Sequence, residues 1–375
     1  MAAPRTVLGA LRQFLPSFLS QVPGLSQDQR RAVGALTHCR TPALGGNAFA
    51  CAPCGELQFA WHSCNHKACP QCGGAATAHW VQRELGKLVH APYFLVTFTL
   101  PSELRSCFFG PHAKEAYDLF FTAAAGALSA KLRSAKGFKA LTHGFTAILH
   151  TWNQRLLFHP HLHFLVPGAG LDAQGKLVRV RDPQFLVHLP HLQAAFRQQL
   201  RTLLDRHGWQ ADPEAWRKDW GVHIQPVGSG APALLYLGRY VARTAIHDSR
   251  ILQVTKQNVS FRWKNRDAGR TEVCTLPGAD FVKRYLTHVL PRGLRSIRYY
   301  GFCHPTAKAD RLRVQLLAGG PVQLGPSKVF QAQPRLCPCC QRVMIPVARI
   351  PSPRNRSPRG PPASVILAPF KTIPA

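Results

Sequence analysis

The sequence of 375 residues predicts a mixed α/β fold of the α+β type, on three observations. Segments 75–90 and 114–133 carry apolar residues at helical spacing. Segments 92–101 and 144–153 are apolar runs of strand length that contain many β-branched and aromatic residues. Cysteines gather in residues 39–72, ahead of these segments. We therefore expect helices beside a sheet, with a small cysteine-rich module in front of them.

Residues 1–30 are predicted to form an N-terminal helical segment. Their spacing indicates a short amphipathic helix at roughly 5–20 and a second helix that starts near Ser26. Arg12 and Pro16 interrupt the apolar stretch, so a signal peptide is not expected. The chain has no apolar run of about 18 or more residues, so a transmembrane span is not expected either. The prediction is a cytoplasmic protein with no membrane partner and no indicated oligomeric state.

The charge balance is strongly basic. The chain has 47 Lys and Arg against 17 Asp and Glu, a formal net charge of +30, and a hydrophobic share of 46% that is typical of a globular protein. Such an excess is expected of a protein that neutralises phosphates. A membrane-surface protein or a ribosome-associated protein would also be basic, so charge alone leaves these classes open.

The cysteine-rich module has the spacing of a zinc site. In a reducing compartment, metal binding explains cysteines better than disulfides do. The Cys-x2-Cys pattern occurs twice, at Cys51 and Cys54 and at Cys69 and Cys72. Four such thiolates close a tetrahedral Zn²⁺ shell. Further candidate ligands are Cys39, Cys64 and His66. A different choice of four ligands, or a second metal, therefore stays open, and the module either docks on DNA or is purely structural.

A third Cys-x2-Cys pair lies near the other end of the sequence. Cys337 and Cys340 are half of a zinc site, and Cys303 and His304 are the nearest further ligands in sequence. From Pro346 onward Pro, Ser and Arg dominate, which is typical of a disordered basic tail that holds DNA non-specifically.

Three histidines alternate along one apolar run. Side chains of a strand point to opposite faces with period two, so His159, His161 and His163 share a face. Neutral imidazoles that converge on one point suit a divalent metal. The alternative is that they are hydrogen-bonded core histidines.

A later segment predicts a helix that carries two tyrosines. Pro232 fits the first turn of this helix, and Tyr236 and Tyr240 stand four residues apart, so both phenols emerge on one face. Arg239 and Arg243 lie beside them. A phenol has a pKa of about 10, so it attacks a phosphodiester only if nearby positive charge assists it. The alternative is an amphipathic helix with both tyrosines in the core.

Residues 251–276 alternate apolar and polar side chains in runs separated by turn residues, which predicts hairpins. Lys256, Arg262 and Lys264 would form a basic ridge on these hairpins. Because acidic partners are scarce, we expect this ridge to follow a phosphate backbone.

The pairing of HPHLHFLVPGAG with a downstream YLGRY helix resembles the HUH (His-hydrophobic-His) nucleases. Within them it resembles the two-tyrosine rolling-circle transposases of the Insertion Sequence 91 family. TPALGG, SCNHKACPQC, PYFLVTFTLPSEL, HTWNQ and FVKRYLTHVLPRGLRSIRYYG look like segments of that family in the family's order. The resemblance implies an HUH-type palm, in which an antiparallel sheet flanked by helices carries the metal on its central strands and the tyrosine helix packs above it.

The resemblance also implies a chemistry. His161 and His163 would bind Mg²⁺ or Mn²⁺, with His159 or Gln154 as third ligand, and strand parity favours His159. Tyr236 or Tyr240 would attack single-stranded DNA at an insertion-sequence end and leave a 5′-phosphotyrosine link. The other tyrosine would accept a second strand, so that donor and target DNA are joined without ATP. By resemblance, the protein would be associated with a bacterial nucleoid.

The implied domains follow the motifs along the chain. They are a zinc-binding domain at 31–90, a catalytic domain at 91–318, a C-terminal cysteine knuckle at 319–345 and a basic tail at 346–375.

Three other functions are compatible with parts of the sequence. A rolling-circle replication initiator or relaxase shares the strand, metal and tyrosine, but the zinc module upstream favours a transposase. A metallohydrolase commonly needs an HxHxDH run, and here Phe164 and Leu165 follow His163. A non-catalytic zinc-dependent DNA-binding protein would bind DNA in a salt-sensitive manner and form no covalent adduct.

Overall fold

The computed structural model describes residues 5–22, 24–135, 138–218, 220–241, 245–265, 267–322, 334–353 and 366–367. Its helices are α1 (Val7–Gln21), α2 (Gln27–His38), α3 (Gly74–Leu85), α4 (Ala113–Ser134), α5 (Leu189–Arg206), α6 (Glu214–Arg217), α7 (Ala231–Val241), α8 (Gly278–Thr287) and α9 (Lys308–Leu317). Its strands are β1 (Gly46–Ala50), β2 (Leu57–Trp61), β3 (Tyr93–Thr99), β4 (Gly144–Trp152), β5 (Phe158–Pro167), β6 (Ala169–Leu171), β7 (Leu177–Arg179), β8 (Val222–Pro226), β9 (Ile251–Val254), β10 (Asn258–Asn265), β11 (Arg270–Pro277), β12 (Ile297–Gly301), β13 (Ile345–Ile350) and β14 (Ile366–Leu367). The strand pairs of the described residues are antiparallel, which confirms a mixed α/β fold with antiparallel sheets.

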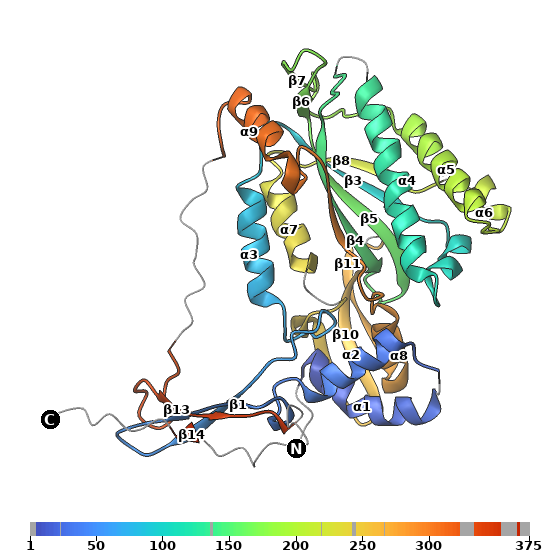
Figure 1. Cartoon of the computed structure of the whole chain (residues 1–375). Coiled ribbons are helices and arrows are strands. Elements are labelled where there is room, and N and C mark those ends of the chain that lie inside the picture. The colour runs from blue at the N-terminus through green and yellow to red at the C-terminus, as the bar shows by residue number, and fades with distance from the viewer. Residues whose placement is uncertain are drawn as a thin grey trace, which may run out of the picture.

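The largest sheet has the strand order β12-β4-β5-β3-β8. The predicted strands at 92–101 and 144–153 and the histidine strand are its three middle strands. On one face Phe94, Phe98 and Phe164 are fully buried in a core that includes Leu128 of α4 and Phe196 of α5. Figure 1 shows α4 and α5 along this side of the sheet, with α3 and α7 along the other. The sheet is therefore a central layer between two pairs of helices.

Helices α3 and α7 cover one end of the second face of this sheet. Ile148 of β4 and Leu165 of β5 form a buried cluster with Trp80 of α3 and Leu237 of α7. The histidines of β5 lie on the same face, because they keep the parity of Leu165 along the strand. The part of this face that carries the histidines borders a cavity, which is described below.

A second hydrophobic core combines the N-terminal helices with the predicted hairpins. Ser26 caps α2 in a capping box with Gln29, which confirms the helix start expected there. Strands β9, β10 and β11 form one sheet, so the hairpin prediction is confirmed. Helix α1 packs so closely on α8 that a Cβ built at Gly278 would lie 2.0 Å from Phe14 Cδ1. Helix α1 thus shares a buried core with α8.

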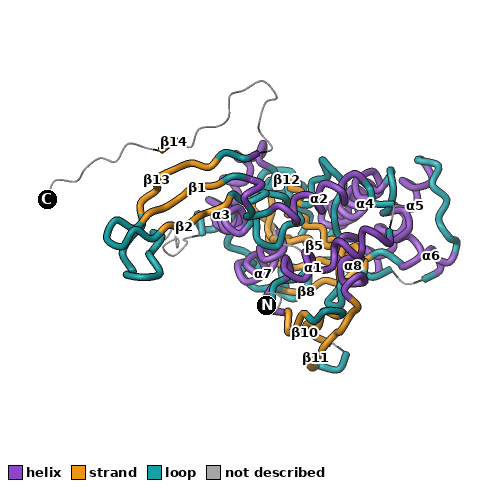
Figure 2. Tube along the Cα trace, turned by 90° about the horizontal axis from the view of Figure 1, so that it is seen from below, coloured by secondary structure: helices purple, strands orange, loops and turns teal. Residues whose placement is uncertain are grey.

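The cysteine-rich module has its own sheet, with the order β14-β13-β1-β2. In this sheet β13 pairs with β1 in an antiparallel register that places Ile350 opposite Gly46. Figure 2 shows β13 beside β1 and β2 at one end of the molecule. The prediction of a disordered tail is therefore wrong for residues 346–350, because the edge of β1 supplies backbone hydrogen-bond partners that composition does not reveal. Residues 354–365 and 368–375 lie outside the described part.

Candidate functional site

Three histidines from the two central strands meet at one point. The register of the antiparallel pair places His150 of β4 opposite His161 of β5. His150, His161 and His163 can each offer a ring nitrogen, and these atoms all lie within 4.8 Å of one another. The ring centroids are 4.7 Å apart for His150 and His163, and 4.8 Å apart for His161 and His163. Such spacing suits three ligands around one cation.

Hydrogen bonds hold these rings in orientation. The Nδ1 of His161 lies 2.7 Å from the carbonyl oxygen of His159, to which it donates, so the lone pair is on Nε2. The Nδ1 of His163 lies 2.9 Å from the Thr97 hydroxyl. Burial, and then the neighbouring imidazoles, lower the pKa of His150 well below its ordinary value. His150 therefore stays neutral, which is the ligating form of histidine.

The third histidine of this group is His150, whereas the expected third ligand was His159 or Gln154. His159 lies outside it, and its Nδ1 accepts a hydrogen bond of 3.0 Å from the Arg105 guanidinium. Burial, and then the charge of Arg105, lower the pKa of His159. Gln154 lines the same cavity, and its backbone carbonyl accepts a hydrogen bond from Arg250. The geometry thus places His150 where strand parity had suggested His159.

A signal for His150 is present in the sequence. A hairpin with its turn between Arg155 and Leu156 pairs residue 150 with residue 161, since the two are equally distant from that point. Residue parity within one strand could not show this, because the missing ligand comes from the neighbouring strand.

Tyr236 faces the histidines across a cavity of about 1340 Å³. Its side chain is 38% exposed, whereas Leu234 and Leu237 of the same helix are buried. The alternative of a core tyrosine is therefore wrong for Tyr236. The side chain of Tyr240, one turn further along α7, lies outside the described residues.

The cavity is basic and partly aromatic. Among the described residues that line it, the one carboxylate is Asp267. Its positively charged and aromatic lining includes Arg155, Arg250, Lys264, Trp152 and Trp263. A polyanion with flat, unpaired bases matches this combination.

Only part of the predicted basic ridge reaches this cavity. Lys264 lines it, whereas Lys256 and Arg262 are exposed on the hairpin sheet and do not. The side chain of Arg239 and the whole of Arg243 lie outside the described residues. Their expected contacts with DNA stay predictions.

Gly238 lets the tyrosine helix approach α3. A Cβ built there would lie 2.3 Å from Val81 Cγ2. We expect Gly238→Ala to lower the free energy of unfolding by about 1–3 kcal/mol through overpacking, although alanine favours helices by about 1 kcal/mol. Thermal melting measures this. Gly34→Ala in α2 is the matched control, because nothing lies within 4 Å of its added Cβ. Equal stabilisation by both variants would contradict close packing of α7 on α3.

Eight of the twelve cysteines form two clusters. The first is Cys39, Cys64, Cys69 and Cys72, and the second is Cys51, Cys54, Cys337 and Cys340. Within each cluster the sulfur atoms all lie within 4.8 Å of one another. Four thiolates in such a group are the ligand set of a structural Zn²⁺ ion.

The single shell of Cys51, Cys54, Cys69 and Cys72 expected from spacing is not formed. Cys51 and Cys54 group with Cys337 and Cys340, whereas Cys69 and Cys72 group with Cys39 and Cys64. Each Cys-x2-Cys pair therefore finds its partners elsewhere in the chain.

The other candidate zinc ligands lie outside both clusters. The Nδ1 of His66 accepts a hydrogen bond of 3.1 Å from the Ala68 backbone. Cys303 and His304, the sequence neighbours considered for Cys337, are also absent from either group of the described residues. The Cys337 and Cys340 pair instead meets Cys51 and Cys54, which are more than 280 positions away in sequence.

Comparisons with known proteins give the family. A family described as "Putative transposase" matches residues 144–311, and one described as "Transposase zinc-binding domain" matches residues 10–100. The chain is 36% identical to the putative transposase y4qJ of Sinorhizobium fredii over 83% of this chain and 82% of that protein. It is 29% identical to the transposase for insertion sequence element IS801 of Pseudomonas savastanoi pv. phaseolicola, over 74% and 71% of the two chains. The chain belongs to the Insertion Sequence 91 family of transposases. No solved structure matches it.

The two matched segments of this transposase contain different parts of the site. Residues 144–311 contain the histidine cluster and Tyr236, and residues 10–100 contain the first cysteine cluster. Cys337 and Cys340, which complete the second cluster, lie beyond both matches. As a transposase, the protein is an enzyme that acts on DNA. None of the helices described for it is both long and apolar enough to cross a bilayer.

Proposed function

We propose that this transposase cleaves and joins single-stranded DNA through a 5′-phosphotyrosine intermediate and moves its insertion sequence by a rolling-circle route. The observation that carries the proposal is the shared cavity of Tyr236 and the histidine cluster. Ligands on the central strands β4 and β5, with α7 on the same face, also support an HUH-type palm.

His150, His161 and His163 would hold the divalent cation. When bound, it supplies Lewis-acid charge to an oxygen of the phosphodiester. Of the two cations expected, Mn²⁺ fits three nitrogen donors better than Mg²⁺ does, because Mg²⁺ strongly prefers oxygen ligands.

The protein's own groups bring a phosphodiester to the tyrosine. Arg155, Arg250 and Lys264 provide positive charge around the strand in the cavity. The phenol oxygen of Tyr236 or Tyr240 attacks phosphorus and loses its proton. A tyrosine–phosphorus bond forms as the bond from phosphorus to the 3′ oxygen breaks, and that oxygen leaves protonated as a 3′-hydroxyl. Attack by a 3′-hydroxyl on the phosphotyrosine reverses these changes and joins two strands without ATP.

Covalent trapping tests this proposal. Purified protein, Mn²⁺ and a labelled single-stranded oligonucleotide of the element end should give protein-linked label on denaturing gels. We expect label in the wild type, and none in the Tyr236→Phe Tyr240→Phe double variant or in His161→Ala. Tyr300→Phe is the matched control, since Tyr300 packs with Phe145 on the opposite face of the sheet.

The outcomes also separate the rival functions. Label that persists in the double tyrosine variant would overturn the proposal. Salt-sensitive DNA binding without any adduct would favour a non-catalytic DNA-binding protein. A replication initiator or relaxase would form the adduct, but would not transfer the strand to an added target DNA.

A further inference from the structure

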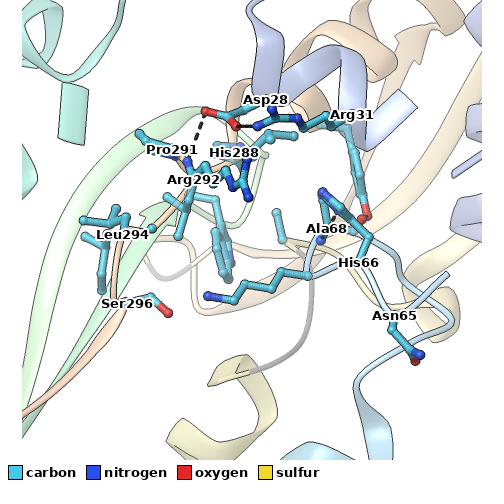
Figure 3. Close-up of a pocket in the computed structure, with 18 residues that line it drawn as sticks. Asp28, Arg31, Asn65, His66, Ala68, His288, Pro291, Arg292, Leu294 and Ser296 are labelled. Carbon is cyan, nitrogen blue, oxygen red and sulfur yellow. Dashed lines mark hydrogen bonds and ion pairs between the residues drawn. The ribbon is translucent and has the colours of Figure 1, made fainter. Parts of the chain in front are cut away.

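A smaller cavity lies beside the histidine cavity, and we call it the junction pocket (Figure 3). It forms where α2, loop 65–68 and segment 288–296 meet over the end of β4, and its volume is about 390 Å³. Small-ligand sites typically have roughly 300–1,000 Å³. Loop 65–68 connects two ligands of the first cysteine cluster, so the zinc-binding module supplies one wall of the pocket.

The junction pocket adjoins the histidine cluster directly. Trp152 and Ala245 line both cavities. The Trp152 ring is stacked on His150, with centroids 5.4 Å apart and an interplanar angle of 14°. A single indole therefore stands between the pocket and one of the expected metal ligands.

The interior of the pocket is apolar and uncharged. Leu149 and Leu294 are buried in its wall, at 4% and 3% exposure, beside Trp152. His288 also lines it, and its ring nitrogens lie 3.2 Å from the Thr151 hydroxyl and 3.1 Å from the Leu156 carbonyl. Burial lowers the pKa of His288 to about 4, so this ring is neutral at physiological pH. Such an interior suits a flat, apolar group.

The rim of the pocket is cationic. Arg31, Lys67 and Arg292 are exposed around it. The one carboxylate among its described lining residues is Asp28, which lies 3.5 Å from Arg31 and accepts a hydrogen bond of 3.1 Å from the Arg292 backbone (Figure 3). Because Asp28 already has these partners, the rim presents net positive charge to a ligand.

We propose that the junction pocket binds one unpaired nucleotide of the DNA strand, with its base against Trp152 and its phosphates at the cationic rim. The proposal rests on the proposed function, since the phosphodiester to be cleaved would lie in the adjoining cavity. Base stacking on an aromatic ring and phosphate contacts with Lys and Arg are the two interactions that single-stranded DNA offers. A paired base is held inside its duplex and cannot enter. His66 and Ser296 add polar groups that can contact the base edge.

Equilibrium binding tests the pocket without the chemistry. The protein is the full chain with Tyr236→Phe and Tyr240→Phe, without added Mg²⁺ or Mn²⁺. The probes are fluorescein-labelled single-stranded oligonucleotides of the element end, each with one abasic nucleotide at a different position. At one position the missing base should weaken binding by about 5-fold or more. Ser296→Trp, which fills the pocket, should weaken binding of the intact oligonucleotide similarly and remove the difference at that position.

Charge variants give a second measurement that does not depend on Ser296→Trp folding. Lys67→Ala with Arg292→Ala should reduce the slope of log affinity against log salt by about 2. Arg206→Ala is the matched control, because Arg206 is an exposed cation of α5 on the opposite side of the sheet, and the slope should not change.

Two results would overturn the proposal that the junction pocket binds an unpaired nucleotide. One is equal binding of all abasic oligonucleotides, and the other is an unchanged salt slope in the double charge variant. If the unmodified protein still forms the tyrosine adduct, the proposed function stands without the pocket. An abasic-sensitive position without any adduct would support the pocket and overturn the proposed chemistry.

Discussion

Cys337→Ser is expected to lower the zinc content of the purified protein from two ions per chain to one. Its sulfur lies 3.4 Å from that of Cys54, within the second cysteine cluster. A serine hydroxyl does not replace a zinc-bound thiolate. Zinc binding contributes on the order of 10 kcal/mol to a small module of this kind, so β13 should also separate from β1. Elemental analysis measures the zinc, and hydrogen exchange measures protection of the β13 amides.

Cys339→Ser is the matched control for this prediction. Cys339 is exposed, lies between the two ligands in sequence, and belongs to neither cluster. It should leave two zinc ions and the β13 protection unchanged. A zinc content in Cys337→Ser equal to that of the wild type would show that the second cluster does not hold a metal.

His150→Ala should weaken Mn²⁺ binding by at least about 100-fold, because the substitution removes one of three clustered imidazoles. Loss of residues that only orient a ligand already costs roughly 10- to 100-fold in metal affinity. Titration calorimetry measures the affinity directly. The tyrosine adduct should disappear in parallel at Mn²⁺ concentrations that saturate the wild type.

His159→Ala and Gln154→Ala are the controls for His150→Ala. Both residues line the cavity, but neither belongs to the cluster. The hydrogen bond of His161 goes to the backbone carbonyl of His159, so the alanine variant keeps it. Both variants should hold Mn²⁺ within about 10-fold of the wild type. A larger loss of Mn²⁺ affinity in His159→Ala than in His150→Ala would show that His159 is the third ligand, as strand parity predicts.

Local patterns in the sequence predicted several helices and strands of the described residues, including those that carry the site. Period-two alternation placed His161 and His163 on one face, and the apolar runs at 92–101 and 144–153 became their neighbouring strands. The i, i+4 pattern predicted α7 with Tyr236 on its exposed face. These features depend on residues a few positions apart, where spacing fixes geometry.

Features that depend on distant residues could not be predicted in this way. The third histidine comes from another strand, and choosing it requires the pairing register. The sorting of cysteines into two clusters depends on Cys54 meeting Cys337, which no local spacing encodes. Strand β13 has a tail-like composition and is ordered through its pairing with β1. The junction pocket is likewise formed by several segments far apart in the chain.

The second cysteine cluster sets the order in which this protein can mature. Cys51 and Cys340 are 289 positions apart, so the first half of the cluster is translated long before the second. While the catalytic segment is being translated, β1 lacks its partner strand β13, and Cys51 and Cys54 lack Cys337 and Cys340. Because Cys337 is translated 283 positions after Cys54, this module completes only after the intervening catalytic segment has been made. A nascent chain that stops before Cys337 therefore cannot build this module, however well its remaining parts fold.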